Sequence, residues 1–269
     1  MLGTDAWKTT RGTSMALGNG YMRSRALTLI LLALFPFCAS ATTWGKPEAV
    51  ADPIRNGAKC VVSEPMSSGS YIYHWPSKYD QVFWPLTDRN GIWFCRDTGF
   101  AAFIGDFELS AAERGALSVY LPQVYVKRIR GRPDLPILLE LLQQSYSKRE
   151  KDREFRIQLL RVLAYYNDTE LHDYVASAAF RREALTMMEE DLGTSLREEQ
   201  RLEYLFVSAA YYQELGETEK SDHMLRQLDA ASAMSSEKLK GYVEYLSSLK
   251  GDVARIVPGG PLAPDLPDN

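Results

Sequence analysis

Cysteine and histidine, the side chains from which metal centres and many catalytic sites are built, are few in this sequence, with three of each. A closed structural zinc site takes four such ligands at tight spacing. Beyond the N-terminal region the chain offers Cys60, Cys95 and at best His74, with Asp97 as an unusual fourth ligand. Because this set is incomplete, the sequence predicts no metal centre.

Catalytic motifs are missing as well. The chain contains no Gly-x-Ser-x-Gly nucleophile elbow, no Gly-rich phosphate-binding loop and no His-Glu-x-x-His pair. His172 and His223 lie among charged residues in helical sequence, where exposure to solvent accounts for them. Catalytic groups do not have to be adjacent in sequence, but these observations favour a non-catalytic protein that needs no cofactor.

The charge and composition of the chain argue against a nucleic acid as its partner. The chain has 31 Lys and Arg against 35 Asp and Glu, so it lacks the basic surplus of a nucleic-acid-binding protein. Its 45% hydrophobic residues are typical of a globular protein. A short basic run over residues 127–132 predicts a solvated connection, or else a contact with anionic lipid, lipopolysaccharide or peptidoglycan.

Residues 1–41 have the pattern of a secretory signal peptide. Two arginines precede an uncharged apolar run over 26–35, and Ala39-Ser40-Ala41 supplies small residues at alternate positions. A membrane anchor is the alternative, but this run is shorter than the roughly 20 apolar residues that span a bilayer. We therefore expect cleavage after Ala41 and a periplasmic or secreted protein with no stable membrane span. Met22 is the alternative start of translation.

The next part of the chain changes from linker-like to strand-like sequence. Residues 42–58 show no periodicity and predict a linker, and residues 59–122 predict a small head. Aromatic-rich stretches at 70–75 and 91–95 predict short strands. A helix is expected to begin at Ser110, because Ser110 and Glu113 fit a capping box.

Aromatic residues are concentrated in this head, with eleven between Tyr71 and Phe107. Large rings fill the core of a small domain, and this is the interpretation we favour. The alternative is a stacking platform for sugars or peptide side chains. If such a platform exists, Tyr79 and Trp84 are its candidates, because both lie beside turns.

Residues 133–257 predict a series of amphipathic helices. Each carries one apolar stripe, as in Phe155, Leu159, Val162, Leu163 and Tyr166. Breaks are expected at 167–168, at 193–195 and at Gly216, so that successive helices stack as antiparallel hairpins. The Pro- and Gly-rich residues 258–269 predict a disordered tail.

Residues 203–228 resemble one tetratricopeptide unit. Ala209 and Tyr212 occupy the small and aromatic positions of its first helix, and Leu215-Gly216 forms the turn. Ser221 and Leu225 match the second helix, whereas Leu228 replaces the usual Ala and the closing Pro is missing. This resemblance implies a mainly α fold, with tetratricopeptide-like antiparallel helical hairpins preceded by a small α+β head.

In such stacks the first helix of each hairpin lines a concave face that binds a partner. The residues of this helix left outside its apolar stripe are predicted to bind the partner: Arg201, Tyr204, Ser208 and Tyr211. Tyrosine is frequent at binding hot spots. The competing interpretation, of equal weight, is that Tyr204 and Tyr211 pack against a neighbouring helix.

The stretch 93–103, followed by Gly105-Asp106-Phe107, resembles an uncharacterised bacterial family. Its members carry two Cys-x-x-Cys knuckles followed by tetratricopeptide-like helices. Here each knuckle keeps only its first cysteine, in Cys60-Val-Val-Ser63 and Cys95-Arg-Asp-Thr98. The resemblance therefore implies lost metal binding and, in an oxidising compartment, a Cys60–Cys95 disulfide.

Together these patterns predict a non-catalytic, exported protein of the bacterial cell envelope that acts in protein–protein interaction or as a scaffold. Its partner would be another envelope protein. The alternative is a carbohydrate- or peptidoglycan-binding protein that uses the aromatic head.

Overall fold

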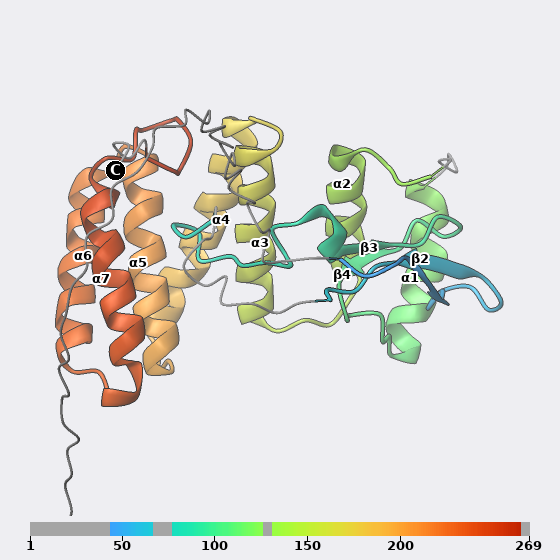
Figure 1. Cartoon of the computed structure of the whole chain (residues 1–269), viewed down its shortest axis with the longest axis horizontal. Helices are drawn as coiled ribbons and strands as arrows, with labels where there is room; N and C mark the ends of the chain where they lie inside the picture. Colours follow the sequence, from blue (N-terminus) through green and yellow to red (C-terminus); the bar gives the residue numbers. More distant parts are fainter. Residues whose placement is uncertain (1–43, 67–76, 126–130, 265–269) are drawn as a thin grey trace, which may run out of the picture. The chain divides into compact units, whose positions relative to one another are not determined.

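The computed structural model describes residues 44–66, 77–125 and 131–264, which all lie in one compact unit of residues 40–269. The predicted signal peptide 1–41, the predicted strand 70–75 and most of the basic run 127–132 lie outside the described residues. The described part is mainly helical, with seven α-helices and four short strands (Figure 1).

The strands form two separate two-stranded antiparallel sheets. Strand β1 (Glu48–Ala51) pairs with β2 (Lys59–Val62), and β3 (Ile92–Phe94) pairs with β4 (Ala101–Phe103). A 3₁₀ turn, η2 (Arg89–Gly91), leads into β3. The last residue of this turn must be glycine, because a Cβ there would lie 1.9 Å from the Pro85 carbonyl oxygen.

Strand β1 corrects the linker prediction for residues 42–58. Glu48–Ala51 has neither the alternation nor the aromatic content that reveals a strand in sequence. Its conformation is set by pairing with β2, where Val50 lies opposite Cys60. Tertiary pairing overrides the local pattern here.

The helices follow in the order α1 (Ala111–Val124), α2 (Leu135–Tyr146), α3 (Arg153–Thr169), α4 (Tyr174–Leu192), α5 (Glu198–Glu214), α6 (Thr218–Ala233) and α7 (Lys240–Val253). Another 3₁₀ turn, η3 (Glu237–Leu239), precedes α7. None of the described helices combines the length and the hydrophobicity that crossing a membrane requires.

Local signals account for several helix ends. The capping box at Ser110 is confirmed, since its side chain accepts a hydrogen bond from the Glu113 amide and the Glu113 carboxylate accepts one from the Ser110 amide. Helix α4 ends before Gly193, and α5 ends before Gly216, which adopts a φ of +78°.

The break predicted at 167–168 is wrong, because α3 continues to Thr169. Asn and Asp usually favour helix ends. Here Asp168 is buried, and its carboxylate accepts a hydrogen bond from the side chain of Arg181 in α4. The turn follows instead at Glu170–Asp173, where the Asp173 side chain caps α4.

Two hydrophobic cores organise the described residues. The N-terminal core comprises the buried residues of β2, β3, β4, α1, α2 and part of α3. The C-terminal core comprises those of α4, α5, α6 and α7 with Ile157 and Leu160 of α3. Helix α3 therefore serves both cores, and it lies between the strands and α4 (Figure 1).

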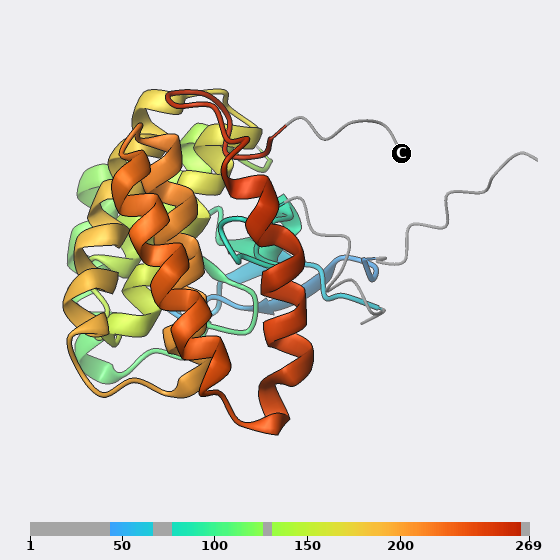
Figure 2. The same cartoon turned by 90° about the vertical axis from the view of Figure 1, so that its left-hand side faces the viewer.

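The segment after α7 is part of this C-terminal core, which corrects the disordered tail predicted for 258–269 as far as residue 264. Leu262 is only 3% exposed. The Gly259 amide donates to the Glu214 carbonyl, and the Leu262 amide donates to the Asp168 carboxylate. Figure 2 shows this segment, in dark red, running across the helix ends. Residues 265–269 lie outside the described residues.

Candidate functional site

The residues predicted to bind a partner on α5 do not form an exposed surface. Tyr204, Ser208 and Tyr211 are 2%, 0% and 0% exposed. Arg201 is half-buried, and its guanidinium donates to the main-chain carbonyls of Leu192 and Thr194. Because α5 packs against α4, α6 and α7, little of its circumference reaches solvent. The predicted binding face is therefore wrong, and both tyrosines belong to the core.

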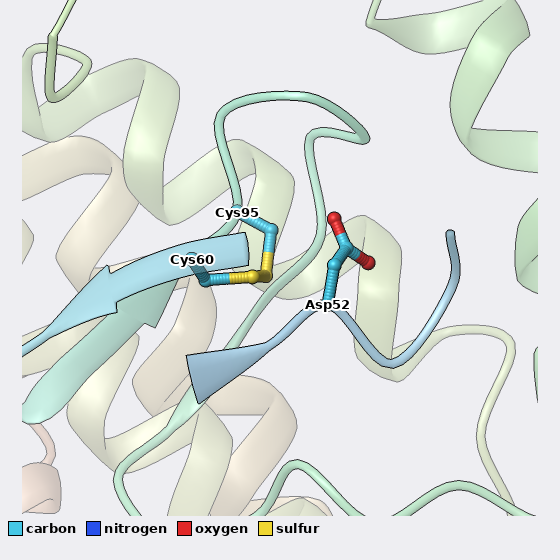
Figure 3. Close-up of side chains that lie close together, drawn as sticks. All are labelled: Asp52, Cys60 and Cys95. Atoms are coloured by element: carbon cyan, nitrogen blue, oxygen red, sulfur yellow. A yellow bond between two sulfur atoms is a disulfide. The ribbon is translucent and has the colours of Figure 1, made fainter. Parts of the chain in front are cut away.

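The Cys60–Cys95 disulfide is confirmed (Figure 3). It joins β2 to the residue that follows β3, across a sequence separation of 35 residues, with the two Cα atoms 4.6 Å apart. Both cysteines are buried in the N-terminal core. In the chain-entropy model, closing a loop of this length stabilises the folded state by up to about 4 kcal/mol.

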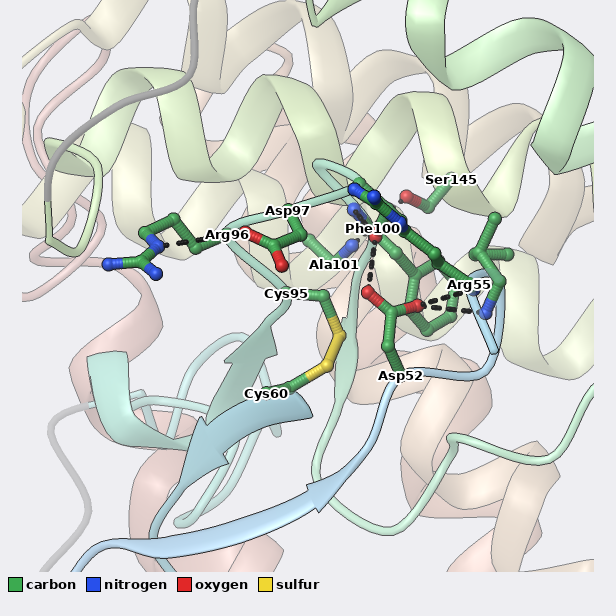
Figure 4. The surroundings of a disulfide bond; sticks show 11 residues. Asp52, Arg55, Cys60, Cys95, Arg96, Asp97, Phe100, Ala101 and Ser145 are labelled. Atoms are coloured by element: carbon green, nitrogen blue, oxygen red, sulfur yellow. Dashed lines mark hydrogen bonds and ion pairs between the residues drawn. A yellow bond between two sulfur atoms is a disulfide. The ribbon is translucent and has the colours of Figure 1, made fainter. Parts of the chain in front are cut away.

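Asp52 lies next to this disulfide and organises the surrounding backbone (Figure 4). One carboxylate oxygen accepts hydrogen bonds from the amides of Ile54 and Arg55, and the other accepts one from the Thr98 hydroxyl. Thr98 stands three residues after Cys95. The Thr98 bond thus links the loop after β1 to the loop after β3, and the disulfide links that second loop to β2.

A carboxylate beside two sulfurs resembles a ligand set. One oxygen of Asp52 and the two Sγ atoms lie within 4.8 Å of one another, and they are the one such grouping that the described residues contain. Cysteine binds metal as the thiolate, and these two sulfurs are bonded to each other. In its oxidised form the cluster is therefore a structural element of the head.

The described aromatic rings of the head pack inward. Trp93, Phe100 and Phe103 are buried in the N-terminal core. Tyr79 is 2% exposed and donates a hydrogen bond to Asp252 of α7, so it offers no ring to the stacking platform for which it was a candidate, and the inward packing that we favoured holds for it. Trp84 is half-buried, and its ring centroid lies 5.2 Å from that of Trp44.

An open cavity of about 440 Å³ borders β2 and β3, and we call it the β2–β3 groove. It has apolar walls and three cationic side chains, and no acidic residue is among the described residues that line it. The lining residues are Pro47, Lys59, Val61, Val62, Ser63, Asn90, Ile92, Trp93, Phe94, Arg96, Gly131 and Arg132.

Sequence reasoning did not find this groove, because its cations come from three separate segments. Lys59 lies on β2, Arg96 follows β3, and Arg132 precedes α2. Arg132 is anchored by hydrogen bonds to the Ile92 carbonyl and to the Asn90 side chain. Only Arg132 belonged to the basic run 127–132 that the sequence showed.

A second polar feature is fully internal and surrounds Arg181 of α4. This guanidinium is 0% exposed and lies 2.6 Å from an Asp168 carboxylate oxygen, 3.7 Å from Asp80 and 3.9 Å from Glu214. The Tyr211 hydroxyl donates to Asp80 over 2.7 Å. We call these five residues the Arg181 cluster.

Within the Arg181 cluster the charges are incompletely satisfied. Both Glu214 carboxylate oxygens and the Arg181 Nε and Nη1 atoms are buried without a hydrogen-bond partner among the described residues. Burial raises the pKa of the Asp80 and Glu214 carboxyl groups, and Arg181 offsets only part of that rise. The cluster is therefore best read as an internal structural network, since none of its five side chains is exposed.

Arg161 of α3 attaches the loop around Asp80 to the helices. Its guanidinium donates to the main-chain carbonyls of Asp80 and Gln81 and lies 2.6 Å from a Glu203 carboxylate oxygen. A loop that precedes β3 in the chain is thereby buried against the C-terminal core.

Comparison of the chain with known protein families, with curated proteins and with solved structures gives no match in any of the three. The class of protein that this fold and site support therefore rests on the physical features above.

Proposed function

We propose that this chain is an exported, non-catalytic protein of the bacterial cell envelope that binds another protein or acts as a scaffold. The observation that carries this proposal is the buried Cys60–Cys95 disulfide in the N-terminal core. Such bonds persist in oxidising compartments and are rare in the cytosol. The signal-like pattern of residues 1–41 supports the same compartment.

Binding is favoured over catalysis because the buried carboxylates are used to hold the chain together. Asp52 caps backbone amides, and Asp168 binds Arg181 and the Leu262 amide. The two described histidines each contact a neighbour four residues earlier or later in the chain: His172 the Asp168 carbonyl, and His223 the Gln227 amide. Neither histidine is positioned against a nucleophile by any of these bonds.

We further propose that the helices follow a tetratricopeptide-like plan. Two equivalent bonds support this: Ser177 of α4 donates to the Ala164 carbonyl of α3, and Ser221 of α6 donates to the Ala209 carbonyl of α5. Each serine is the fourth residue of its helix. All four residues are buried. The α3–α4 hairpin and the α5–α6 hairpin therefore each contain the same kind of close contact between small residues.

Fractionation of cells that express the full chain tests the export proposal. We expect the protein in the periplasmic or secreted fraction, with its N-terminus at Thr42 and with Cys60 and Cys95 unreactive to alkylation until reduced. A matched variant without residues 26–35 should stay in the cytoplasm. Cytoplasmic wild-type protein in which Cys60 and Cys95 are both free thiols would contradict the proposal.

Capture from an envelope extract tests the binding proposal. Chemical cross-linking in intact cells, followed by purification, should recover a discrete protein in a fixed ratio to the bait. Retention on isolated peptidoglycan, without any protein partner, would instead favour the carbohydrate-binding alternative.

A further inference from the structure

The walls of the β2–β3 groove are formed by the residues that flank the two cysteines. Lys59 and Val61 lie on either side of Cys60, and Phe94 and Arg96 lie on either side of Cys95. Along β2 the cysteine is buried while Lys59 and Val61 are exposed, as the alternation of a strand requires. The disulfide thus holds the two walls at a fixed separation.

Both strands beside the groove have an unpaired edge. Strand β2 pairs only with β1, and β3 pairs only with β4, within the described residues. The Asp52 amide donates to the Ala58 carbonyl, which places Cys60 among the hydrogen-bonded pairs of the β1–β2 ladder. The main-chain groups of Lys59 and Val61 therefore point away from β1.

The edge of β2 opposite β1 faces β3. The Ser63 carbonyl, two residues beyond Val61, accepts a hydrogen bond from the Trp93 indole of β3 over 3.1 Å. On β3, the Ile92 carbonyl accepts one from Arg132. These two carbonyls are already bonded. The main-chain groups of Lys59 and Val61 on the same edge of β2 have no backbone partner among the described residues, and an extended peptide uses such groups when it adds to the edge of a sheet.

The positive charge of the groove favours a peptide that carries acidic side chains. Lys59, Arg96 and Arg132 all line it, and Arg96 has a side chain that is 65% exposed. Between them lies an apolar surface, in which Val61 is 69% exposed. A ligand that matches this pattern carries carboxylates at intervals and apolar side chains between them.

We propose that the β2–β3 groove binds an extended, acidic peptide segment of a partner protein. This inference rests on the proposed function, because it names the surface and the kind of segment through which partner binding would occur. It moves the binding site from α5 to the head, where Lys59 and Val61 lie on the face of β2 opposite the buried Cys60.

A peptide pool tests the groove directly. The exported, oxidised protein is dialysed against a pool of peptides of about six residues, the length of a typical strand, with Glu at alternate positions and varied apolar residues between. Mass spectrometry measures which peptides are retained. One comparison pool replaces Glu with Lys, and another carries N-methylated backbone amides.

We expect retention of the Glu pool and weaker retention of both comparison pools. The double variant Lys59→Glu/Arg96→Glu should bind the best peptide at least about tenfold more weakly, because two exposed attractions become repulsions. The matched control Arg114→Glu, an exposed cation on α1 outside the groove, should bind normally. Thermal unfolding should show that both variants remain folded.

Two results would overturn the inference: equal retention of the Glu and Lys pools, or unchanged affinity in the double variant. Binding of anionic lipid vesicles or inorganic phosphate in preference to the Glu pool would also overturn it. Cross-linking separates this failure from that of the proposed function. If the double variant captures the same partner as wild type, the partner-binding proposal stands and the groove is excluded; if neither captures a partner, the proposed function itself fails.

Discussion

Each core is stabilised internally by a different kind of interaction, a disulfide in the N-terminal core and a buried cluster of charged residues in the C-terminal core. The N-terminal core has a covalent link, Cys60–Cys95, and beside this core the Asp106 carboxylate accepts hydrogen bonds from Arg149, Lys151 and Tyr146. The C-terminal core has no disulfide among its described residues and instead encloses the Arg181 cluster. A small strand-rich region has a limited core, so a covalent constraint adds to its stability. The stacked helices bury a larger apolar surface, and this core tolerates the buried charges that it encloses.

The pKa values of acidic residues in the two halves of the structure are consequently shifted in opposite directions. Burial alone would raise the pKa of Asp106, but the hydrogen bonds from Lys151, Arg149 and Tyr146 outweigh it and lower that pKa. Burial dominates for Asp80 and Glu214, whose pKa values are raised. A carboxylate near the surface with three donors is thus satisfied, while one in the interior facing a shared arginine is not.

The largest expected effect concerns the buried guanidinium. Arg181→Met should reduce the free energy of unfolding by about 3–5 kcal/mol, because it leaves Asp168, Asp80 and Glu214 buried without their cation. Urea unfolding measures the loss. The neighbouring Arg182→Met removes an exposed arginine from the same helix and should change stability by no more than about 0.5 kcal/mol. Equal effects of the two substitutions would show that the Arg181 cluster contributes nothing specific.

Loss of the disulfide should follow in size. Cys60→Ser with Cys95→Ser should cost about 2–4 kcal/mol, because the unfolded chain regains the entropy of an open loop. Hydrogen exchange should show the loss of protection in β2, β3 and β4 and little change in α5 or α6. Uniform loss across both cores would mean that they unfold as one unit, and the contrast between them would not extend to stability.

Two tyrosines on α5 offer a smaller, matched contrast. The Tyr211 hydroxyl donates to the buried Asp80 carboxylate, whereas the Tyr204 hydroxyl accepts a hydrogen bond from the Gln200 amide. Tyr211→Phe should cost about 1.5–3 kcal/mol and Tyr204→Phe about 0.5–1.5 kcal/mol, since bonds to charged groups are stronger. Thermal and urea unfolding of the two variants, compared with wild type, decides the order.

The smallest effect expected is a divergent response to pH. The folded state binds fewer protons at Asp106 than the unfolded state, so its stabilisation is present above the ordinary pKa of 3.8 and is lost below it. The folded state binds more protons at Glu214, so stability falls as the pH rises through and above its ordinary value of 4.5. The charges of Arg181 and Arg182 lower the pKa of Glu214, and those of Asp168 and Asp80 raise it.

Hydrogen exchange at about pH 3.5 and about pH 6.5, corrected for intrinsic rates, compares the two cores in the carboxyl range. Acid should weaken protection near Asp106 and strengthen it near Glu214. Asp106→Asn should reduce the first response, and Glu214→Gln should reduce the second, to which Asp80 also contributes. The same response in both cores would show that burial and pairing do not separate these carboxyls.

Features set by neighbouring residues could be predicted from the sequence. The capping box at Ser110 and the helix end at Gly216 depend on a few adjacent positions. The mainly helical class follows from apolar stripes, and the Cys60–Cys95 bond agrees with the pairing that the family resemblance implied.

The predictions that failed concern residues whose surroundings are set by several neighbouring elements or by residues distant in the sequence. The stripe on α5 predicts one buried face, but α4, α6 and α7 cover others, so Tyr204 and Tyr211 are buried. Arg181 stands beside Arg182 and Glu183 and looks solvated in sequence. Its partners Asp80, Asp168 and Glu214 are distant along the chain, and no local pattern connects them. The β2–β3 groove was missed for the same reason.

The segment that follows α7 has a consequence for how the protein is made. The Asp168 carboxylate accepts a hydrogen bond from the amide of Leu262, which lies 94 positions later in the chain. The Glu214 carbonyl accepts one from the Gly259 amide. While the ribosome is still adding residues before Gly259, the C-terminal core lacks both bonds and the apolar cover of Leu262. Domains generally fold as units during synthesis, N-terminal first. Here the last closure must wait for residues beyond the final described helix, so the C-terminal core cannot be completed before Leu262 has been synthesised.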